Sequence, residues 1–513
     1  MSQIRLFSGL LTVGAWTMLS RIFGFVRDIM LAAFLGAGPV AEAFLVAFSL
    51  PNLFRRFFAE GAFNMAFVPM FSKRVDDPEV ARAFARDTFA ALSFILVLFS
   101  AVGMIFMPAL VYAMAAGFSG DARFDLAVEY GRVAFPYVLF ISLAALLSGV
   151  LNAHGKFVAA AAAPVLLNIS LITAMLTAWW LGWDAGYTLV WTVPIAGFLQ
   201  LALVWIAADR LGFRLLPRLP KWTPEIRQLL IIAGPAALAG GVVQINLLVG
   251  RQVASTFDGA IAWLSYADRL YQLPLGVVGI ALGVVLLPDL SKRLKANDTS
   301  GGQNAFNRAT ELSLALTLPA AAALVAIPLP LITVLFERGA FEAADSQATA
   351  LAVAIYGLGL PAFILQKVLQ PLYFAREDTK RPFYFALAAL VINAVCAIGL
   401  RPYIGFTAAA WGTTIAAWGM AGLLWWYARD MGQAARFDKR LATRTPKILA
   451  ASLLMGGAAY GMAAILDPVW SNDTWRIPGL IGVIAASMII YAVLARALGA
   501  FRISELKAQL KRS

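Results

Sequence analysis

Four arginines and one aspartate lie within or beside long apolar stretches of this 513-residue sequence: Arg21, Arg27, Asp28, Arg55 and Arg269. A charge at the centre of a lipid bilayer costs at least about 2.5–3.5 kcal/mol, so such side chains must face protein or water. A guanidinium binds phosphate oxygens through two parallel hydrogen bonds. The four arginines therefore predict an anion-binding cavity, with these five residues as its substrate-binding candidates.

Helical geometry relates several of these residues to nearby charges. Arg21 and Asp28 are two turns apart and share a helix face, whereas Arg27 projects about 100° away from Asp28. Arg56 and Glu60 are spaced as an i,i+4 ion pair. Simple pairing of this kind, or snorkelling to the interface, is the alternative explanation for the embedded charges. It explains Arg56–Glu60 well and the four cavity arginines poorly.

Further residues could set the charge of the cavity or bend its helices. The acidic candidates for cavity charge and gating are Glu42 and Asp268, in addition to Glu60. Pro51 precedes Arg55 and Pro274 follows Arg269. Proline removes a helix hydrogen bond and bends the helix, so we expect both to act as hinges of gating helices, although an ordinary kink is an equal alternative.

The composition indicates that these elements are membrane-spanning helices. Hydrophobic residues make up 61% of the chain and charged residues 13%, and the mean hydropathy is +0.78. Soluble domains are nearer half apolar and a quarter charged, so a soluble protein is excluded. The single cysteine and single histidine argue against disulfides, thiolate metal sites and histidine catalysis. We therefore expect no cofactor and no metal site.

The sequence predicts fourteen membrane spans, because a spanning helix needs about 20 apolar residues. Twelve segments lack Asp, Glu, Lys and Arg altogether: 88–120, 133–153, 157–183, 185–208, 228–250, 270–288, 312–336, 346–366, 383–400, 402–428, 448–466 and 477–495. Two more, about 6–36 and 42–72, are interrupted by the charges described above. An even number of spans places both termini on one side of the membrane.

The loop charges predict cytoplasmic termini. With that orientation, 29 of the 41 Lys and Arg residues lie in inside loops or the tail and 5 in outside loops. Lys and Arg concentrate in cytoplasmic loops of membrane proteins. The same asymmetry explains the net charge of +13 without a nucleic-acid partner. The last residues, 501–513, resemble an amphipathic helix on the cytoplasmic surface.

An internal repeat predicts two lobes of six helices each. The segments Pro69–Arg74 and Pro288–Arg293 are 219 residues apart, and Pro136 and Asn168 have the same spacing as Pro361 and Asn393. Six is even, so the halves share one orientation, as in rocking transporters that hold substrate between parallel repeats. The fold class expected is an all-α polytopic membrane protein of fourteen helices. Its predicted parts are 1–215, 216–435, two additional helices in 436–500, and the tail 501–513.

Four segments resemble the MurJ (MviN) lipid II flippases of the multidrug/oligosaccharidyl-lipid/polysaccharide exporter superfamily. They are Ser20–Asp28 (SRIFGFVRD), Leu50–Phe63 (LPNLFRRFFAEGAF), Tyr266–Leu270 (YADRL) and Leu287–Lys292 (LPDLSK). The resemblance covers essentially the whole chain. It implies a transporter, not an enzyme, that moves lipid II, an undecaprenyl-diphosphate-linked peptidoglycan precursor, to the periplasmic leaflet of the bacterial inner membrane.

The resemblance also assigns roles to residues of this chain. It implies that Arg21, Arg27, Arg55 and Arg269 are cavity arginines, that Asp28, Glu42 and Glu60 are the matching acidic positions, and that Arg56 matches a family arginine. Ser20, at the start of the first of these segments, is a further candidate for cavity charge or gating. It further implies that the last two spans form a groove for the lipid tail with the second lobe. A sodium site reported for some members has no counterpart in an acidic cluster here. Coupling could use Na⁺, H⁺ or the membrane potential, worth about 2.3 kcal/mol per charge per 100 mV.

Other functions would place different demands on the sequence. A flippase for another polyprenyl-diphosphate-linked glycan has the same charge requirements and stays open on physical grounds. An exporter of cationic drugs, as in the related MATE proteins, should have an acidic cavity. A membrane glycosyltransferase needs a catalytic motif on a sizeable loop, and a scaffold does not explain the buried charges. We expect a monomer among membrane lipids.

Overall fold

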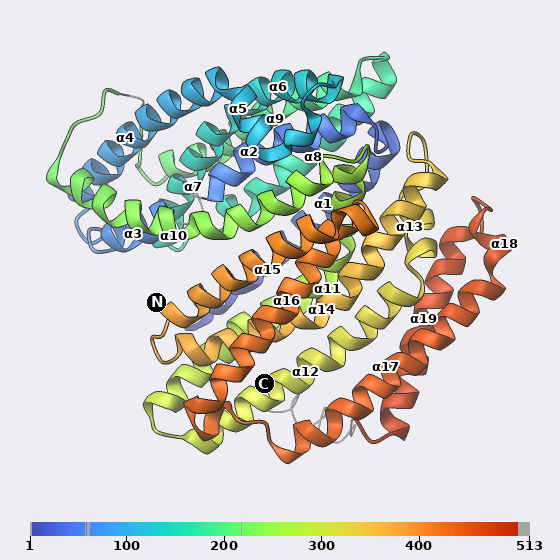
Figure 1. Ribbon diagram of the computed structural model, residues 1–513. Helices are drawn as coiled ribbons and strands as arrows, with labels where there is room; N and C mark the ends of the chain where they lie inside the picture. Colours follow the sequence, from blue (N-terminus) through green and yellow to red (C-terminus); the bar gives the residue numbers. More distant parts are fainter. Residues whose placement is uncertain (1–2, 57, 59–61, 217, 501–513) are drawn as a thin grey trace. The chain divides into compact units, whose positions relative to one another are not determined.

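The computed structural model describes residues 3–56, 58, 62–216 and 218–500, and every regular element in these ranges is helical (Figure 1). Contacts divide the chain into two compact units. Unit 1 contains residues 1–262 and 338–341, and unit 2 contains residues 263–337 and 342–513. The predicted all-α fold class is confirmed. The predicted tail helix in 501–513 lies outside the described residues.

Unit 1 is a bundle of helices around an aromatic and aliphatic core. Phe67 stacks between Phe71 and Phe84, with ring centroids 5.4 and 5.6 Å apart. All three are buried, and they belong to one apolar cluster that joins helix Ala62–Ser72 to helix Pro78–Ile105 and to later helices of the unit. The elements are α1 (Gln3–Leu35), α2 (Pro39–Arg55), α3 (Ala62–Ser72), α4 (Pro78–Ile105), α5 (Met107–Ala115), η2 (Ala116–Phe118), α6 (Ala122–Ala134), α7 (Tyr137–Ala153), α8 (Val158–Leu181), α9 (Ala185–Asp209) and α10 (Pro224–Ala254).

Unit 2 has its own core and carries the last helices of the chain. Tyr373 is buried in this core and donates a 2.6 Å hydrogen bond to the carbonyl of Leu424. Helices α17 and α19 run side by side (Figure 1). The elements are α11 (Ala260–Lys295), α12 (Thr299–Ala326), α13 (Pro328–Phe336), α14 (Ala343–Phe374), α15 (Lys380–Ile404), α16 (Thr407–Ala428), η3 (Arg429–Met431), η4 (Gln433–Ala435), α17 (Lys439–Ile465), α18 (Asp467–Trp470) and α19 (Arg476–Ala497).

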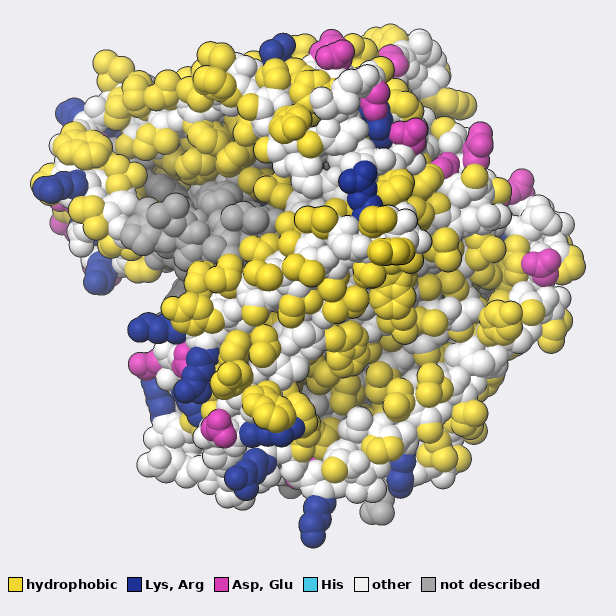
Figure 2. Space-filling model, viewed as in Figure 1, with side chains coloured by type: hydrophobic (Ala, Val, Ile, Leu, Met, Phe, Trp, Pro, Cys, Tyr) yellow, Lys and Arg dark blue, Asp and Glu magenta, His cyan; other side chains and the backbone are white. Residues whose placement is uncertain are grey.

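Nine helices in the described residues are long and apolar enough to cross a membrane. The other five predicted spans also coincide with helices: α1, the pair α2 and α3, α10, α11 and α16. The count of fourteen is therefore consistent with the structure but stays a prediction. Large apolar side chains face outward, including Trp179 and Trp180 at 74% and 79% exposure. Figure 2 shows one face on which hydrophobic side chains predominate, as expected for a surface in contact with lipid.

Several predicted spans are two helices. The segment 88–120 contains α4, α5 and η2, and the segment 312–336 contains α12 and α13. In the segment 42–72, α2 ends at Arg55, Arg56 and Phe58 have π-helical geometry, and α3 begins at Ala62. Pro51 lies inside α2, and Pro274 lies inside the uninterrupted α11, so neither proline ends its helix.

The compact units divide the chain at a different point from the predicted repeat. Helix α10 groups with unit 1, although residue 216 was the expected start of the second lobe. Its buried Leu229 joins the core that contains Phe71. At its other end, Gln252 accepts a 3.0 Å hydrogen bond from the Ala116 backbone, and Ser255 accepts one from Gly117. The lobe boundaries inferred from the repeat stay a prediction.

The repeat positions occupy comparable elements within their own units. Asn168 is buried in α8, and Asn393 is buried in α15. Pro136 precedes α7, at the break that separates it from α6. Pro361 lies within the continuous α14. The two prolines therefore differ in effect: Pro136 lies at a break between two helices, whereas Pro361 lies inside one continuous helix.

Candidate substrate site and apolar groove

Arg27 is fixed in the interior of unit 1 by two polar side chains. Its guanidinium donates to Asp28 Oδ1 from Nε at 3.0 Å and from Nη2 at 2.7 Å, and to Asn168 Oδ1 from Nη1 at 2.8 Å. Arg27 and Asp28 are 7% and 5% exposed. These neighbours leave the helix about 100° apart, and the long arginine side chain bends back to reach the carboxylate.

Arg21 differs from Arg27 in its surroundings. Its side chain is exposed, and no described residue pairs with its guanidinium. One residue before it, the Ser20 carbonyl accepts a 3.0 Å hydrogen bond from Asn168 Nδ2. Asn168 thus contacts both the Ser20 backbone and the Arg27 side chain. The structure brings Ser20, Arg27 and Asp28 together around Asn168, and it leaves Arg21 available for a solute.

Arg55 and Arg56 lie where α2 ends. Arg55 is half-buried and Arg56 is exposed, at the start of the π-helical turn. Glu60, the predicted partner of Arg56, lies outside the described residues, so this pairing stays a prediction. π-Helical turns are often found at functional sites, because they reorient side chains without ending the helix direction.

Glu42 is a buried acid with two donors. It is 1% exposed, and its Oε2 accepts a 2.9 Å hydrogen bond from Arg123 Nη1 while Oε1 accepts a 3.0 Å bond from the Ile261 backbone. Arg123 also pairs with Asp121 at 2.6 Å and Asp258 at 3.0 Å. The carboxylate thus joins α2 to α6 and to the first turn of α11. Arg123 was missed in the sequence, where it was counted only as a loop charge.

The candidates in unit 2 lie in the first part of α11. Asp268 is half-buried and accepts a hydrogen bond from Gln272, one turn later. Arg269 is exposed. Pro274 follows in the same uninterrupted helix. These residues occupy the helix positions that the sequence predicted, in a unit that is described separately from that of Arg21, Arg27 and Arg55.

A second charged cluster in unit 2 was not recognised in the sequence. Glu311 of α12 is 4% exposed and accepts hydrogen bonds from Arg308, from Arg440 at 3.1 and 3.2 Å, and from Arg444 at 2.5 Å. Arg308 also pairs with Asp438. These bonds fasten the start of α17 to α12. Spacings of about 130 residues between the partners hid them from inspection of the sequence.

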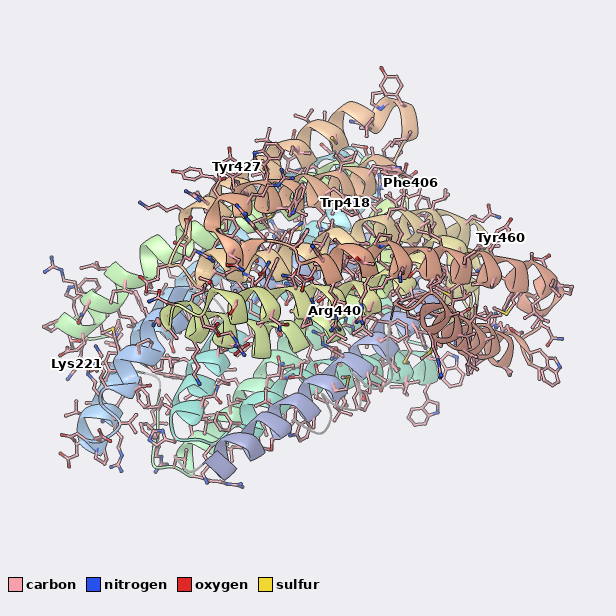
Figure 3. The ribbon with its side chains drawn as sticks, turned by 90° about the horizontal axis from the view of Figure 1, so that it is seen from below. Lys221, Phe406, Trp418, Tyr427, Arg440 and Tyr460 are labelled. Carbon is pink, nitrogen blue, oxygen red and sulfur yellow. The ribbon has the colours of Figure 1, made fainter. Side chains whose placement is uncertain are left out.

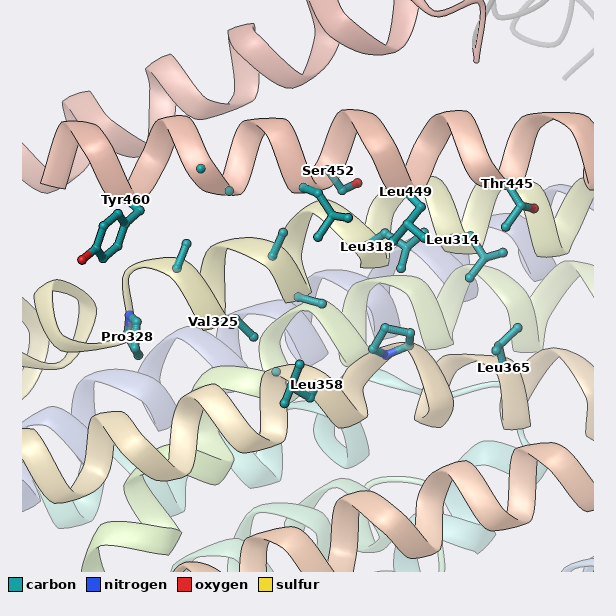
Figure 4. A pocket seen from close by; sticks show the side chains of 18 of the residues that line it. Leu314, Leu318, Val325, Pro328, Leu358, Leu365, Thr445, Leu449, Ser452 and Tyr460 are labelled. Atoms are coloured by element: carbon teal, nitrogen blue, oxygen red, sulfur yellow. The ribbon is translucent and has the colours of Figure 1, made fainter.

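Unit 2 also contains a large apolar groove, with a cavity volume of about 1500 Å³ (Figure 4). Its lining comes from α12, α13, α14, α16, α17, α18 and the segment before α17. Thr445 and Tyr460 lie toward opposite ends of it (Figure 4). Helix α19 packs behind this wall, where Tyr491 donates a 2.7 Å bond to the Ala315 carbonyl. Among the described residues, the groove wall thus includes α17 and α18 but not α19.

The described residues contain no group of three or more His, Cys, Asp or Glu side chains that could hold a metal ion. Carboxylates near the candidate site are instead bonded to arginines, as in Arg27–Asp28 and Arg123–Glu42. The site can therefore bind anions through exposed guanidinium groups. Unit 1 thus presents arginines, one of which is held by a buried acid and a buried amide. Unit 2 contains an apolar groove that could hold a hydrocarbon chain.

Comparisons with known proteins agree with this combination. The profile of the family described as "Lipid II flippase MurJ" matches residues 31–475. The chain is 43% identical to a probable lipid II flippase MurJ of Rhizobium meliloti (strain 1021), over 100% of this chain and 97% of that protein. It is similar to a solved lipid II flippase MurJ in an inward closed conformation, with a TM-score of 0.79, 25% identity, and coverage of 95% and 99%.

A more distant likeness concerns the fold alone. An inward-facing MATE transporter of the MOP superfamily superposes with a TM-score of 0.67 at 14% identity, over 83% of this chain and 98% of that one. The family profile and the Rhizobium relative are decisive, because they extend over most or all of the sequence. This multi-pass membrane protein belongs to the lipid II flippase MurJ family, a family of transporters.

Proposed function

We propose that this protein moves lipid II, the lipid-linked peptidoglycan precursor, from the cytoplasmic to the periplasmic leaflet of the bacterial inner membrane. The observation that carries the proposal is the family match over residues 31–475, together with 43% identity to a probable lipid II flippase over the full chain. The chemistry of the residues is consistent with it. A diphosphate needs cations, and a long hydrocarbon tail needs an apolar surface.

In the proposed mechanism, Arg21, Arg27, Arg55 and Arg269 compensate the diphosphate charge while the polar headgroup crosses the membrane by alternating access. Transfer of an uncompensated charge away from water is very costly, so each cation lowers the barrier. Arg27 would contribute from a fixed position, because Asp28 and Asn168 orient its guanidinium. Arg21 is exposed and would make the more direct contact.

The apolar groove of unit 2 is the proposed site of the lipid tail. Leu441 and Ala464 both line it along α17, and at 1.5 Å per residue this stretch is about 35 Å long. The hydrocarbon core of a bilayer is about 30 Å thick. The groove therefore offers a continuous apolar path of the same length as the membrane core, along which a long tail could stay buried.

The orientation and energetics complete the proposal. The termini are cytoplasmic, the protein acts as a monomer among membrane lipids, and it needs neither a cofactor nor nucleic acid. The membrane potential is a sufficient energy source in magnitude, at about 2.3 kcal/mol per charge per 100 mV. A coupled Na⁺ or H⁺ is the alternative, and transport in vesicles with each gradient collapsed in turn would distinguish the three.

The proposal is tested by measuring the leaflet in which lipid II accumulates. Depletion of this protein in its host should leave lipid II in the inner leaflet, protected from a reagent or enzyme that acts only from the periplasm. Expression of the wild-type chain should restore access. An alanine variant of Arg21 made at normal levels is the matched control and should fail to restore it. Lipid II that stays accessible after depletion would contradict the proposal.

The same experiment distinguishes two other classes of substrate. If another polyprenyl-diphosphate-linked glycan accumulates while lipid II remains accessible, the protein is a flippase with a different headgroup preference. If neither lipid accumulates and resistance to cationic drugs falls, it is an exporter like the MATE proteins whose fold it shares. The arginine-rich candidate site favours the phosphate-bearing substrates.

A further inference from the structure

Arg429, immediately after α16, lies over two tryptophan rings. Its guanidinium carbon lies 3.7 Å from the ring centroid of Trp425 and 4.7 Å from that of Trp426. In the part of the chain that the structure describes, no carboxylate pairs with it and no acceptor takes its side-chain N–H groups. A cation–π contact holds a guanidinium in place without using its N–H groups, which can still donate hydrogen bonds.

This arginine stands at one end of the apolar groove. Trp425 is itself a lining residue, and so is Phe437, whose ring stacks on it at 6.3 Å between centroids. Leu441 continues the wall from these rings into the groove. The lining at the opposite end includes Asp467. The groove is therefore cationic at one end and acidic at the other, so an anionic lipid would fit it in one direction only.

Other arginines on neighbouring elements are already engaged. Arg376 donates to the carbonyls of Leu372 and Met431, and Arg444 pairs with Glu311. Arg440 and Tyr460 mark the course of α17, which forms one wall of the groove (Figure 3). Arg429 differs from Arg376 and Arg444 because aromatic rings alone position it. Its five N–H donors suit the oxygens of a phosphate group.

We propose that Arg429 is a headgroup-docking residue that binds the diphosphate of a polyprenyl lipid whose tail occupies the groove. The inference rests on the proposed function and adds to it a loading position outside the set of Arg21, Arg27, Arg55 and Arg269. There the lipid is held by its tail and its first phosphates before the headgroup is transferred. Trp425 is the positioning residue, since its ring orients the guanidinium and also forms the groove wall.

The length of the groove identifies the occupant. An ordinary acyl chain reaches across one leaflet, half of the hydrocarbon core of about 30 Å. The stretch from Leu441 to Ala464 extends about 35 Å along α17. A chain that fills it with its phosphate at Arg429 must cross both leaflets. A polyprenyl tail satisfies this requirement, and a glycerophospholipid does not.

Binding of defined lipids to the full-length protein tests the proposal. Purified protein would be titrated with undecaprenyl diphosphate, with the uncharged undecaprenol and with phosphatidylglycerol, and the bound fraction would be measured by native mass spectrometry. Arg429→Gln should weaken binding of the diphosphate by at least about tenfold, the effect of losing one charge-assisted hydrogen bond. Binding of undecaprenol should be unchanged, and Arg429→Lys should fall between Gln and wild type.

Arg227→Gln is the matched control. Arg227 is exposed near the start of α10 in unit 1, and its side chain has no bond to a described residue. The Arg227→Gln protein should bind all three lipids as the wild type does. Both Arg227→Gln and Arg429→Gln should keep the wild-type melting temperature. Three results would overturn the inference: an unchanged affinity of Arg429→Gln for the diphosphate, an equal loss for undecaprenol, or an Arg429-dependent preference for phosphatidylglycerol.

The lipid-binding result is separable from the proposed function. Undecaprenyl diphosphate binding that depends on Arg429 would support the docking site even if depletion failed to trap lipid II. Conversely, trapped lipid II together with Arg429-independent binding would retain the flippase and remove the docking site. Each outcome therefore bears on one proposal at a time.

Discussion

Arg27 on α1 donates a 2.8 Å hydrogen bond to the side-chain oxygen of Asn168 on α8, across 141 residues of sequence. The same asparagine donates from Nδ2 to the Ser20 carbonyl, about two turns earlier on α1. A buried amide thus holds the cationic helix at two points. This relationship explains how a guanidinium can be kept inside a membrane protein in a fixed orientation.

Asn168→Ala should destabilise the protein and impair transport together. It leaves a buried guanidinium N–H and the Ser20 carbonyl without their partner, which costs about 1–3 kcal/mol for each unsatisfied group. The melting temperature in detergent and complementation of a depleted strain measure the two effects. Asn152→Ala, at an exposed position of α7, is the control and should change neither. A fully stable, fully active Asn168→Ala would refute the supporting role.

Arg21→Ala should abolish transport without loss of stability. Arg27→Ala should instead lose both transport activity and thermal stability. Arg21 is exposed, whereas Arg27 balances the buried charge of Asp28. Removal of one partner from a buried ion pair leaves the other charge uncompensated. Melting temperatures and lipid II access, measured on the same preparations, separate the two residues. Equal destabilisation by both changes would contradict the assignment.

The ion pair between Glu42 and Arg123 should show strong coupling in a double-mutant cycle. Glu42→Gln or Arg123→Ala alone breaks a buried pair, at a cost of about 3–5 kcal/mol, and the double variant should lose less than the sum. Thermal unfolding of all three proteins provides the measurement. Arg132→Ala, an exposed arginine of the same helix, should be nearly neutral. Additive effects would show that Glu42 does not depend on Arg123.

Acidification should weaken the contacts around Arg123. Hydrogen bonds from the Arg123 guanidinium lower the pKa of Asp121 below its ordinary value of 3.8. A carboxylate whose pKa is lower in the folded state stabilises the protein above pH 3.8 and loses this contribution as the pH falls through the lowered value. Asp121→Asn should therefore melt earlier than wild type at pH 6. The difference should shrink below pH 3.8, and a difference independent of pH would argue against an ionic role.

Cysteine labelling should establish the orientation of the chain. In a Cys396→Ser background, cysteines at Gly38, Asp184 and Asn472 should react with an impermeant reagent added from the periplasm. Cysteines at Asp77, Lys221 and Asp438 should react only after the membrane is permeabilised. The reason is the excess of Lys and Arg in the second set of loops. Labelling with the two sets exchanged would reverse the proposed topology and the direction of transport inferred from it.

The sequence by itself determined the helical architecture and the identity of the candidate arginines. Burial in lipid requires continuous apolar helices, so runs such as 346–366 and 383–400 could be assigned from composition and length. They coincide with α14 and α15. A charge within such a run is conspicuous for the same reason, which is how Arg21 and Arg27 were found.

Tertiary structure alone decided which partners those charges have. Asn168, Arg123 and Glu311 gave no local signal, because a hydrogen bond depends on which helices become neighbours and not on the residues beside it in the chain. The break between α4 and α5 within the predicted span 88–120 was also invisible, since apolar composition is the same in a continuous helix and in two helices. The apolar groove is also a product of tertiary packing. Its wall joins Leu314, Trp425 and Leu449, which are far apart in sequence, and only packing of their helices makes one surface of them.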